Sequence, residues 1–339
     1  MMTRRTRVLQ TAIVVIVGIG TFAKVEVVRS LQSPVIAPLS QVAPFPADNP
    51  TTPEKAALGK QLFFDSRLSG DNSTSCASCH LPDKAFTDGL ERAHGVGGKQ
   101  LARNTPTLLN VGLYSAYFWD GRAGSLESQA LVPISSPDEM NQNPSELEKE
   151  LNSIPGYVSH FQAVFGSRVT KENIARALAA FERTLISRNS PFDRFLAGDS
   201  NALSDEAKRG WELFKGDAGC IRCHNGPTLS DGKFYRLGVA FTDHGRGAIT
   251  GQRRDLYAFR TPSLRDVART APFMHDGSLH SLSDVVEFYY RGVPRQSPDG
   301  SPLDVEPLLE RSFSEISDIV AFLEALNGGP ERVSVPRLP

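Results

Sequence analysis

The chain has 339 residues, of which 40% are hydrophobic and 22% are charged. This composition is that of an ordinary globular protein, and it excludes collagen-like, coiled-coil and largely disordered chains. The 37 basic and 38 acidic residues give a formal net charge of −1, which lacks the basic excess typical of nucleic-acid-binding proteins. We therefore expect no nucleic-acid partner, and the length favours two domains over one.

Residues 1–30 depart from this average. Arginines at positions 4, 5 and 7 precede an apolar run over about residues 8–23, which is the layout of a secretory signal peptide. The run is shorter than the roughly 20 apolar residues of a membrane-spanning helix, and no clear cleavage site follows it. We predict that residues 1–30 are a signal peptide or a retained anchor that tethers an exported protein to a membrane, and that the proline-rich residues 31–53 form a linker.

Further along the chain, apolar residues recur at helical spacing in several segments. The pattern predicts helices over residues 57–63, 172–185, 208–214, 282–290 and 313–326. The last of these ends before Asn327-Gly328-Gly329-Pro330, a strong stop signal. A link over residues 188–203 is expected to join the two halves of the chain.

All four cysteines belong to two copies of one motif, Cys76-Ala-Ser-Cys79-His80 and Cys220-Ile-Arg-Cys223-His224. Covalent attachment of a c-type haem requires two thiols that add to the vinyl groups, and a histidine directly after the second thiol to bind the iron. The alternatives are a zinc site, a thioredoxin-like redox pair or disulfides, but none of them explains the histidine after each pair. We predict two c-type haems, with His80 and His224 as iron ligands.

The two motifs lie in an internal repeat. Gly-x-x-Leu-Phe occurs before each motif, beginning at Gly59 and Gly210. After the motifs, Arg103-Asn-Thr-Pro106 is echoed by Arg260-Thr-Pro262, and Phe118-Trp-Asp-Gly121 is echoed by Met274-His-Asp-Gly277. We predict an N-terminal haem domain over residues 54–195, a C-terminal haem domain over residues 196–330, and a tail over residues 331–339.

The repeat indicates where the two haem sites differ. Tyr289 lies 14 residues after His275, and the matching position 14 residues after Trp119 is Pro133. A tyrosine can bind iron whereas proline has no ligating atom, so the second iron is expected to be capped and the first to be open to a small molecule. Alternatives from the residues alone are a core role for Tyr289 or Tyr290, thioether ligation by Met140 or Met274, and a swing of His94 onto the first iron.

Peroxide chemistry at an open haem requires a carboxylate that takes a proton from the bound oxygen and delivers it to the leaving oxygen. In the segment after Trp119, the candidate carboxylates are Glu139, Glu127 and Asp138, and the amide of Gln129 is a further candidate for a polar group near this iron. The residues alone do not choose among them, and a solvated acidic loop is the alternative.

The chain resembles the bacterial di-haem cytochrome c peroxidases and the related MauG-type enzymes over about residues 50–330. The likeness rests on both haem motifs and on Arg-Asn-Thr-Pro-Thr-Leu-Leu-Asn, Phe-Trp-Asp-Gly-Arg-Ala, Arg-Thr-Pro-Ser-Leu-Arg and His-Asp-Gly-Ser-Leu. It implies an all-α, mostly helical fold of two cytochrome c-like domains in the periplasm, each holding one covalent haem. Hydrogen peroxide would react at the N-terminal haem, and the C-terminal haem would relay electrons.

The resemblance also implies roles for single residues. Trp119 matches the tryptophan that relays electrons between the haems, and Gln129 and Glu139 match the distal-pocket glutamine and acid–base glutamate. This removes Glu127 and Asp138 from the candidates. A further set matches the residues that bind one calcium ion through oxygen atoms, namely Asn104, Thr270 and Pro272.

Tyr289 matches the position that is methionine in the bacterial peroxidases and tyrosine in MauG-type enzymes. An ionised tyrosine favours higher iron oxidation states. The tryptophan that MauG uses to oxidise its protein substrate is replaced here by Ala218, and Trp211, the other tryptophan, is expected in the core. We expect the partner to be a small electron donor, cytochrome c or cupredoxin, or alternatively a protein substrate. A non-enzymatic electron-transfer cytochrome is the hypothesis from another class.

Overall fold

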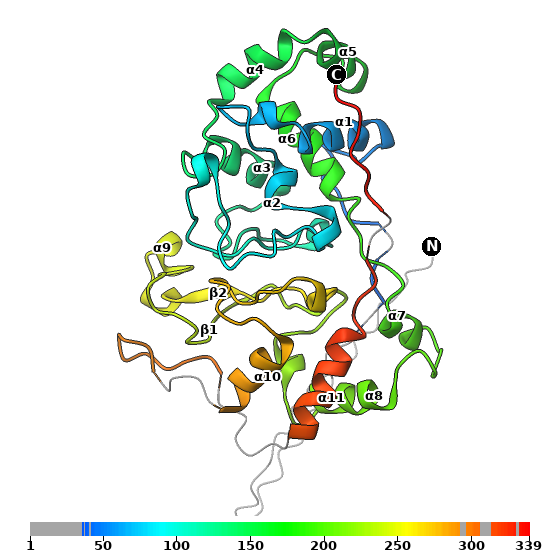
Figure 1. The fold of residues 1–339 in the computed structure, drawn as a ribbon, viewed down its shortest axis with the longest axis vertical. Helices are drawn as coiled ribbons and strands as arrows, with labels where there is room; N and C mark the ends of the chain where they lie inside the picture. The colour runs from blue at the N-terminus through cyan, green and yellow to red at the C-terminus, as the bar shows by residue number, and fades with distance from the viewer. Residues whose placement is uncertain (1–35, 37, 41, 292–295, 306–312, 330–331) are drawn as a thin grey trace, which may run out of the picture. The chain divides into compact units, whose positions relative to one another are not determined.

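The computed structural model describes residues 36, 38–40, 42–291, 296–305, 313–329 and 332–339, which belong to one compact unit over residues 34–339. The segment 1–30, expected to be a signal peptide or an anchor, lies outside the described residues. The described chain is mostly helical, as the sequence predicts (Figure 1). Within the described ranges, no helix combines the length and the apolar character needed to cross a membrane.

Short helices separated by long loops make up both halves of the chain. The first half contains α1 (Pro53–Phe63), α2 (Cys76–Cys79), α3 (Leu126–Ser135), α4 (Pro144–Asn152), α5 (Pro155–Phe165) and α6 (Lys171–Glu182). The second half contains α7 (Pro191–Leu196), α8 (Asp205–Lys215), α9 (Gly247–Thr250), α10 (Leu282–Arg291) and α11 (Phe313–Glu324), together with the antiparallel strands β1 (Phe234–Arg236) and β2 (Ala258–Arg260).

The internal repeat is visible as two equivalent helix crossings. A Cβ atom added to Gly59 of α1 would lie 1.9 Å from the carbonyl oxygen of Ala177 in α6, and one added to Gly210 of α8 would lie 1.9 Å from the carbonyl oxygen of Asp318 in α11. Only glycine permits backbones to approach this closely. The Gly-x-x-Leu-Phe signature therefore marks the same packing of two helices in each half.

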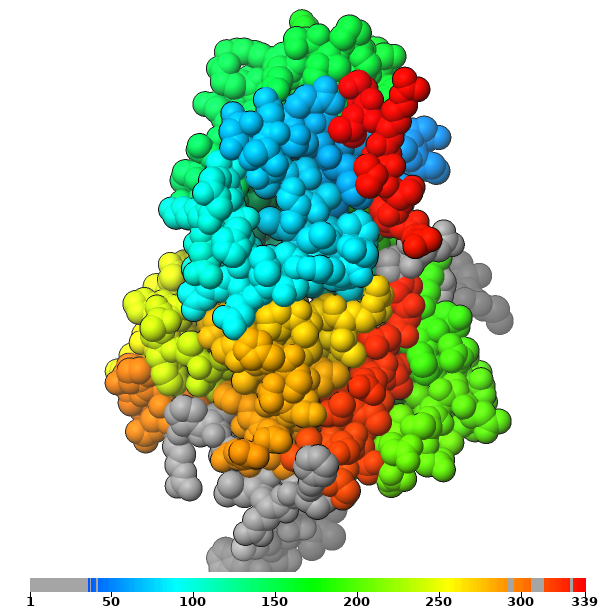
Figure 2. All heavy atoms as spheres, viewed as in Figure 1, coloured from blue at the N-terminus to red at the C-terminus, as the bar shows by residue number. Residues whose placement is uncertain are grey.

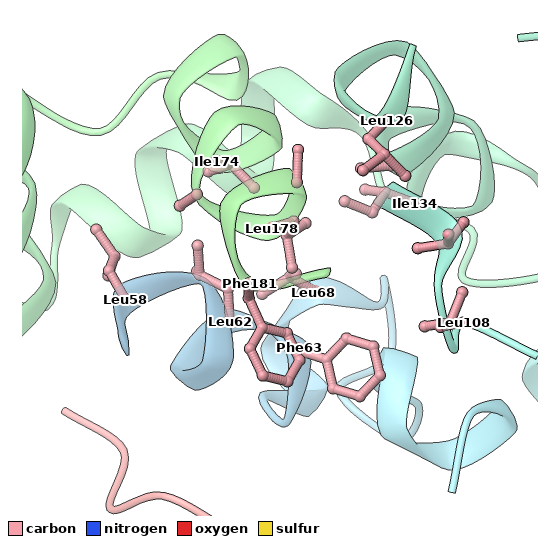
Figure 3. Close-up of a cluster of buried hydrophobic side chains, with 14 of the residues drawn as sticks. Leu58, Leu62, Phe63, Leu68, Leu108, Leu126, Ile134, Ile174, Leu178 and Phe181 are labelled. Atoms are coloured by element: carbon pink, nitrogen blue, oxygen red, sulfur yellow. The ribbon is translucent and has the colours of Figure 1, made fainter. Parts of the chain in front are cut away.

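Each half has its own hydrophobic core. In the first, Phe63 of α1 lies 5.1 Å from Phe181 of α6 between ring centroids, among leucines and isoleucines of α3 and α6 (Figure 3). In the second, Trp211 of α8 packs on Phe322 of α11 at 5.2 Å. Trp211 is only 9% exposed, which confirms its predicted place in the core.

Matching backbone hydrogen bonds join the two halves. The Asn104 N–H donates to the carbonyl of His275 at 2.9 Å, and the Arg260 N–H donates to the carbonyl of Trp119 at 2.8 Å. These four residues occupy equivalent positions in the two repeats. The loops that carry them form the band where the first half meets the second (Figure 2). The junction places Trp119 and His275 between the two halves.

Three segments that the sequence predicts to be linkers or a tail pack against the two halves of the protein. Leu39 and Ala43, in the stretch predicted to be a linker, are buried. At the other end of the chain, the carbonyl of Arg337 accepts from Gln61 Nε2 at 3.1 Å, so residues 332–339 return to the first half (Figure 1). The predicted link 188–203 contains α7, which joins the second core through Phe192.

Two of the predicted helices are shorter than expected. α6 ends at Glu182 rather than at residue 185, because the chain tightens there into bonds three residues apart: the Thr184 N–H donates to the Phe181 carbonyl at 2.9 Å, and the Leu185 N–H to the Glu182 carbonyl at 3.0 Å. α11 ends at Glu324, two residues before the predicted end.

Candidate functional site: two cavities with a shared wall

Both motif histidines are held in the same way by a backbone carbonyl. His80 Nδ1 lies 3.0 Å from the carbonyl oxygen of Phe86, and His224 Nδ1 lies 3.0 Å from that of Leu229. Because a carbonyl only accepts, Nδ1 must be the donor, and Nε2 remains as the nitrogen that can bind a metal. Burial lowers the pKa of both histidines, which favours the neutral, metal-binding form.

The first cavity has a volume of about 830 Å³. It is lined by three residues of the first motif, Cys76, Cys79 and His80. Four further candidate residues also line it, namely Trp119, Gln129, Pro133 and Glu139. Gln129 and Pro133 belong to α3, and Glu139 lies in the turn after that helix. Burial raises the pKa of the Glu139 carboxyl above its ordinary value. Within a haem cavity, a carboxyl group whose pKa is raised in this way is suited to exchange a proton with a bound substrate.

The Glu139 backbone is fixed on both sides. Its N–H donates to the Ser136 carbonyl at 3.2 Å, and its own carbonyl accepts from the Val96 N–H at 2.9 Å. The loop that donates this bond also passes close by, since a Cβ atom on Gly95 would meet the Asp138 carbonyl at 1.8 Å. The glycine-rich loop over residues 94–98 therefore holds the backbone of Glu139 in place through backbone contacts.

The second cavity has a volume of about 770 Å³. The motif residues that line it are Cys220, Cys223 and His224, and Tyr289 of α10 lines it too. Burial, together with the nearby thiols of Cys220 and Cys223, raises the pKa of the Tyr289 hydroxyl. A bound cation is therefore needed to favour its ionised form.

Trp119 and His275 line both cavities. The Trp119 Nε1–H donates to the carbonyl of Asn104 at 3.0 Å, which fixes the indole ring. The imidazole of His275 stacks on Phe259 at 3.7 Å between centroids, and the side chain is buried. The wall between the cavities therefore includes one aromatic side chain from the equivalent position of each repeat, alongside other residues that line both cavities, namely Asn104, Thr105, Pro106, Thr107, Tyr114 and Arg260.

Comparison with known proteins identifies the family. Residues 53–201 match the family described as di-haem cytochrome c peroxidase. The methylamine utilization protein MauG of Methylorubrum extorquens is 46% identical over 304 residues, which cover 87% of this chain and 84% of that protein. The cytochrome c551 peroxidase of Nitrosomonas europaea is 38% identical over 90% of this chain and 89% of its own. The chain belongs to the di-haem cytochrome c peroxidase and MauG family.

A solved structure supports the same conclusion. A MauG-like protein associated with microbial copper homeostasis shares the fold with a TM-score of 0.78 at 31% identity, covering 89% of this chain and 97% of that one. As a member of the family the chain is an oxidoreductase, and its two Cys-x-x-Cys-His motifs are haem-binding motifs. The two cavities fit this cofactor, because each presents two thiols and a histidine whose Nδ1 is already hydrogen-bonded.

The residues expected to bind calcium all line the second cavity, namely Asn104, Thr270 and Pro272. Asn104 Nδ2 donates to the Leu90 carbonyl at 2.8 Å, which leaves the side-chain oxygen as the group that can face a cation. Among the described residues no cluster of three or more His, Cys, Asp or Glu side chains could hold a metal. A calcium ion here would depend on amide and backbone oxygens.

The structure also places the other residues that the sequence offered as iron ligands or as the acid–base group. His94 is exposed, and although its neighbour Gly95 lines the first cavity, His94 does not. Met140 lines the first cavity and Met274 the second. Glu127 is held away from acid–base work by Asn49 and Arg183, at 2.6 and 2.7 Å.

Sequence reasoning missed three residues at these cavities. Glu182 of α6 lines the first cavity, is 5% exposed, and has its pKa raised to about 8 by burial. Tyr235 of β1 lines the second cavity, and His275 was noted only as the counterpart of Trp119. For Glu182, the sequence gives one indication of burial: the residue directly follows the apolar run Ala-Ala-Phe of the predicted helix.

Proposed function

We propose that the protein reduces hydrogen peroxide to water in the first cavity, with electrons supplied through the second. Two electrons and two protons convert one peroxide molecule into two water molecules. A haem held by His80 supplies the iron that binds peroxide and takes part in its reduction. The remaining work falls to side chains of this chain.

Glu139 is proposed to move the proton. Its carboxylate takes a proton from the peroxide oxygen nearer the iron and returns it to the other oxygen, so that water rather than hydroxide leaves. Gln129, which lines the same cavity, is proposed to polarise the oxygen. The proposal depends on the Glu139 carboxyl, which is half-buried and has a raised pKa. It lines the cavity in which Pro133, at the position equivalent to Tyr289, has no atom that can bind iron.

Electrons are proposed to pass from the second haem to the first past Trp119. This indole lies in the wall common to both cavities and is fixed by its hydrogen bond to Asn104. His224 and Tyr289 are proposed as the two ligands of the second iron. A cytochrome c or a cupredoxin is the proposed donor, and we further propose that the protein is exported to the periplasm and carries one calcium ion.

A second candidate function is the oxidation of residues in a partner protein. It is favoured by Tyr289, whose side chain lines the second cavity, and by the 46% identity to a relative named methylamine utilization protein MauG. In this case the partner's residues replace the small donor protein as the source of electrons.

The test is to replace Glu139 by glutamine in the holoprotein. We expect peroxide turnover to fall by about 10²–10⁴-fold, the usual contribution of a general acid–base group, while both haems stay attached. The matched control is Asp138→Asn, because Asp138 also lines the first cavity but is exposed and paired with Lys99. A Glu139→Gln variant with unchanged turnover would contradict the proposal and favour a pure electron-transfer cytochrome.

A further inference from the structure

The second cavity has a tyrosine–aspartate pair at its edge that neither haem attachment nor iron ligation uses. Tyr235 Oη donates to Asp231 Oδ2 at 2.6 Å. Tyr235 lines the cavity together with Cys223 and His224. Neither Tyr235 nor Asp231 is fully buried. The pair therefore connects the haem-attachment edge of the cavity with the protein surface.

The aspartate is held in place to receive a proton. Its N–H donates to the carbonyl of Cys223 at 2.8 Å, and its Oδ1 accepts from the Lys233 N–H at 3.0 Å. One carboxylate oxygen is thus occupied by the backbone, while the other accepts from the phenol. Burial and the hydrogen bond to Asp231 raise the pKa of the Tyr235 hydroxyl, so the phenol keeps its proton until an electron is removed.

The chain has few other aromatic groups that could pass an electron from this cavity to a partner. Of its two tryptophans, Trp119 lies between the cavities and Trp211 is packed in the second core. Ala218, at the position of the MauG tryptophan, is buried and has no redox-active side chain. Three other tyrosines line the same cavity. Tyr289 is the proposed iron ligand, Tyr114 also lines the first cavity, and the ring of Tyr257 packs on Phe241 and His244.

We propose that Tyr235 is the exit through which oxidising equivalents leave the second haem for an electron donor outside the protein, with Asp231 as its proton acceptor. Tyr235 gives one electron toward the haem pair, previously oxidised by hydrogen peroxide. Its hydroxyl proton passes at the same time to Asp231 Oδ2, which leaves a neutral tyrosyl radical beside a protonated carboxyl. The outside donor then returns one electron, and the proton moves back to the phenol. The inference rests on the proposed peroxide chemistry.

The test uses the oxidised holoprotein, mixed with hydrogen peroxide in the absence of reductant and frozen for electron paramagnetic resonance. We expect a tyrosyl signal in the natural protein, its loss in Tyr235→Phe, and a weaker or shorter-lived signal in Asp231→Asn. The control Tyr257→Phe should keep the signal. Haem absorbance, recorded on the same samples, should respond to peroxide equally in all four proteins and shows that each variant folds and carries its haems.

Two results would overturn the proposal, and they are distinguishable. If haem absorbance responds to peroxide but Tyr235→Phe keeps the tyrosyl signal, or no such signal forms in the natural protein, the exit is not Tyr235. If haem absorbance does not respond in any of the proteins, the proposed peroxide chemistry fails and the exit fails with it. A purely structural role for the pair predicts haem loss in Tyr235→Phe with no change in the radical signal per haem.

Discussion

The two cavities share a frame and differ in the residues that project into it. Each frame has a helix crossing at a glycine, Gly59 or Gly210, and a histidine tied to a backbone carbonyl. The projecting residues diverge, since Pro133 of α3 lines the first cavity where Tyr289 of α10 lines the second. The comparison teaches that a duplicated scaffold fixes where the cofactors are held, while substitutions at equivalent positions set what each site can do.

The largest effect is expected for Pro133→Tyr, which gives the first cavity the residue found at the equivalent position of the second. We expect the new side chain to occupy the site of peroxide and to lower turnover at least as much as loss of an acid–base group, about 10²–10⁴-fold. Peroxide turnover and the haem spin state measure the effect. Pro133→Ala is the control, and equal activity in the two variants would show that position 133 does not face the iron.

The reciprocal change is Tyr289→Met, which replaces a hard anionic ligand by a thioether. Methionine ligation raises the reduction potential of a c-type haem, so we expect the potential of the second haem to rise and the oxidised protein to lose its direct reaction with peroxide. Redox titration followed by absorbance gives the potential. An unchanged potential and low-spin spectrum would exclude Tyr289 as a ligand.

A third difference between the cavities is electrostatic. Gly59 faces Phe181 and Gly210 faces Phe322, so Glu182 of the first half matches Leu323 of the second, and both line their cavities. Burial raises the pKa of Glu182 to about 8, well above the roughly 4.3 of an unfolded glutamate. Between these values the folded state keeps a proton that the unfolded state has lost.

Stability should therefore fall as pH rises from about 5 to 8, by up to about 1.4 kcal/mol per pH unit from this one group. Glu182→Gln removes the dependence, because an amide does not titrate in this range. Urea unfolding of the holoprotein at several pH values measures it. If the natural protein and the variant show the same slope between pH 5 and 8, Glu182 is not the buried proton-holding group.

The smallest expected effect is a loss of stability on substitution of the glycines at the two equivalent helix crossings. Alanine at Gly59 or at Gly210 places a Cβ atom 1.9 Å from a facing carbonyl oxygen, and overpacking of this kind costs about 1–3 kcal/mol. We expect similar losses of stability in the two variants by thermal unfolding. Gly124→Ala is the control, since a Cβ atom there has no neighbour within 4 Å. A large loss at only one of the two crossings would show that the halves are not packed alike.

The sequence predicts the motifs and the repeat better than it predicts the surroundings of single residues. Cys-x-x-Cys-His and Gly-x-x-Leu-Phe are local patterns with a chemical or steric cause, so they identify the haem sites and the helix crossings. Burial of Glu182 and the place of His275 in both cavity walls depend on loops that are distant in sequence. The helix within residues 188–203 was missed for a similar reason, since α7 is short and depends on the second core that Phe192 enters.

The central claim is that the first site is open to peroxide and that the second, through Tyr289, accepts oxidising equivalents without prior reduction. The most direct test is to add one equivalent of hydrogen peroxide to the fully oxidised holoprotein, with no reductant, and to follow the haem absorbance in a stopped-flow instrument. The account predicts immediate bleaching of the ferric bands. No change until one haem has been reduced would contradict it and would show that the first iron is blocked in the resting protein.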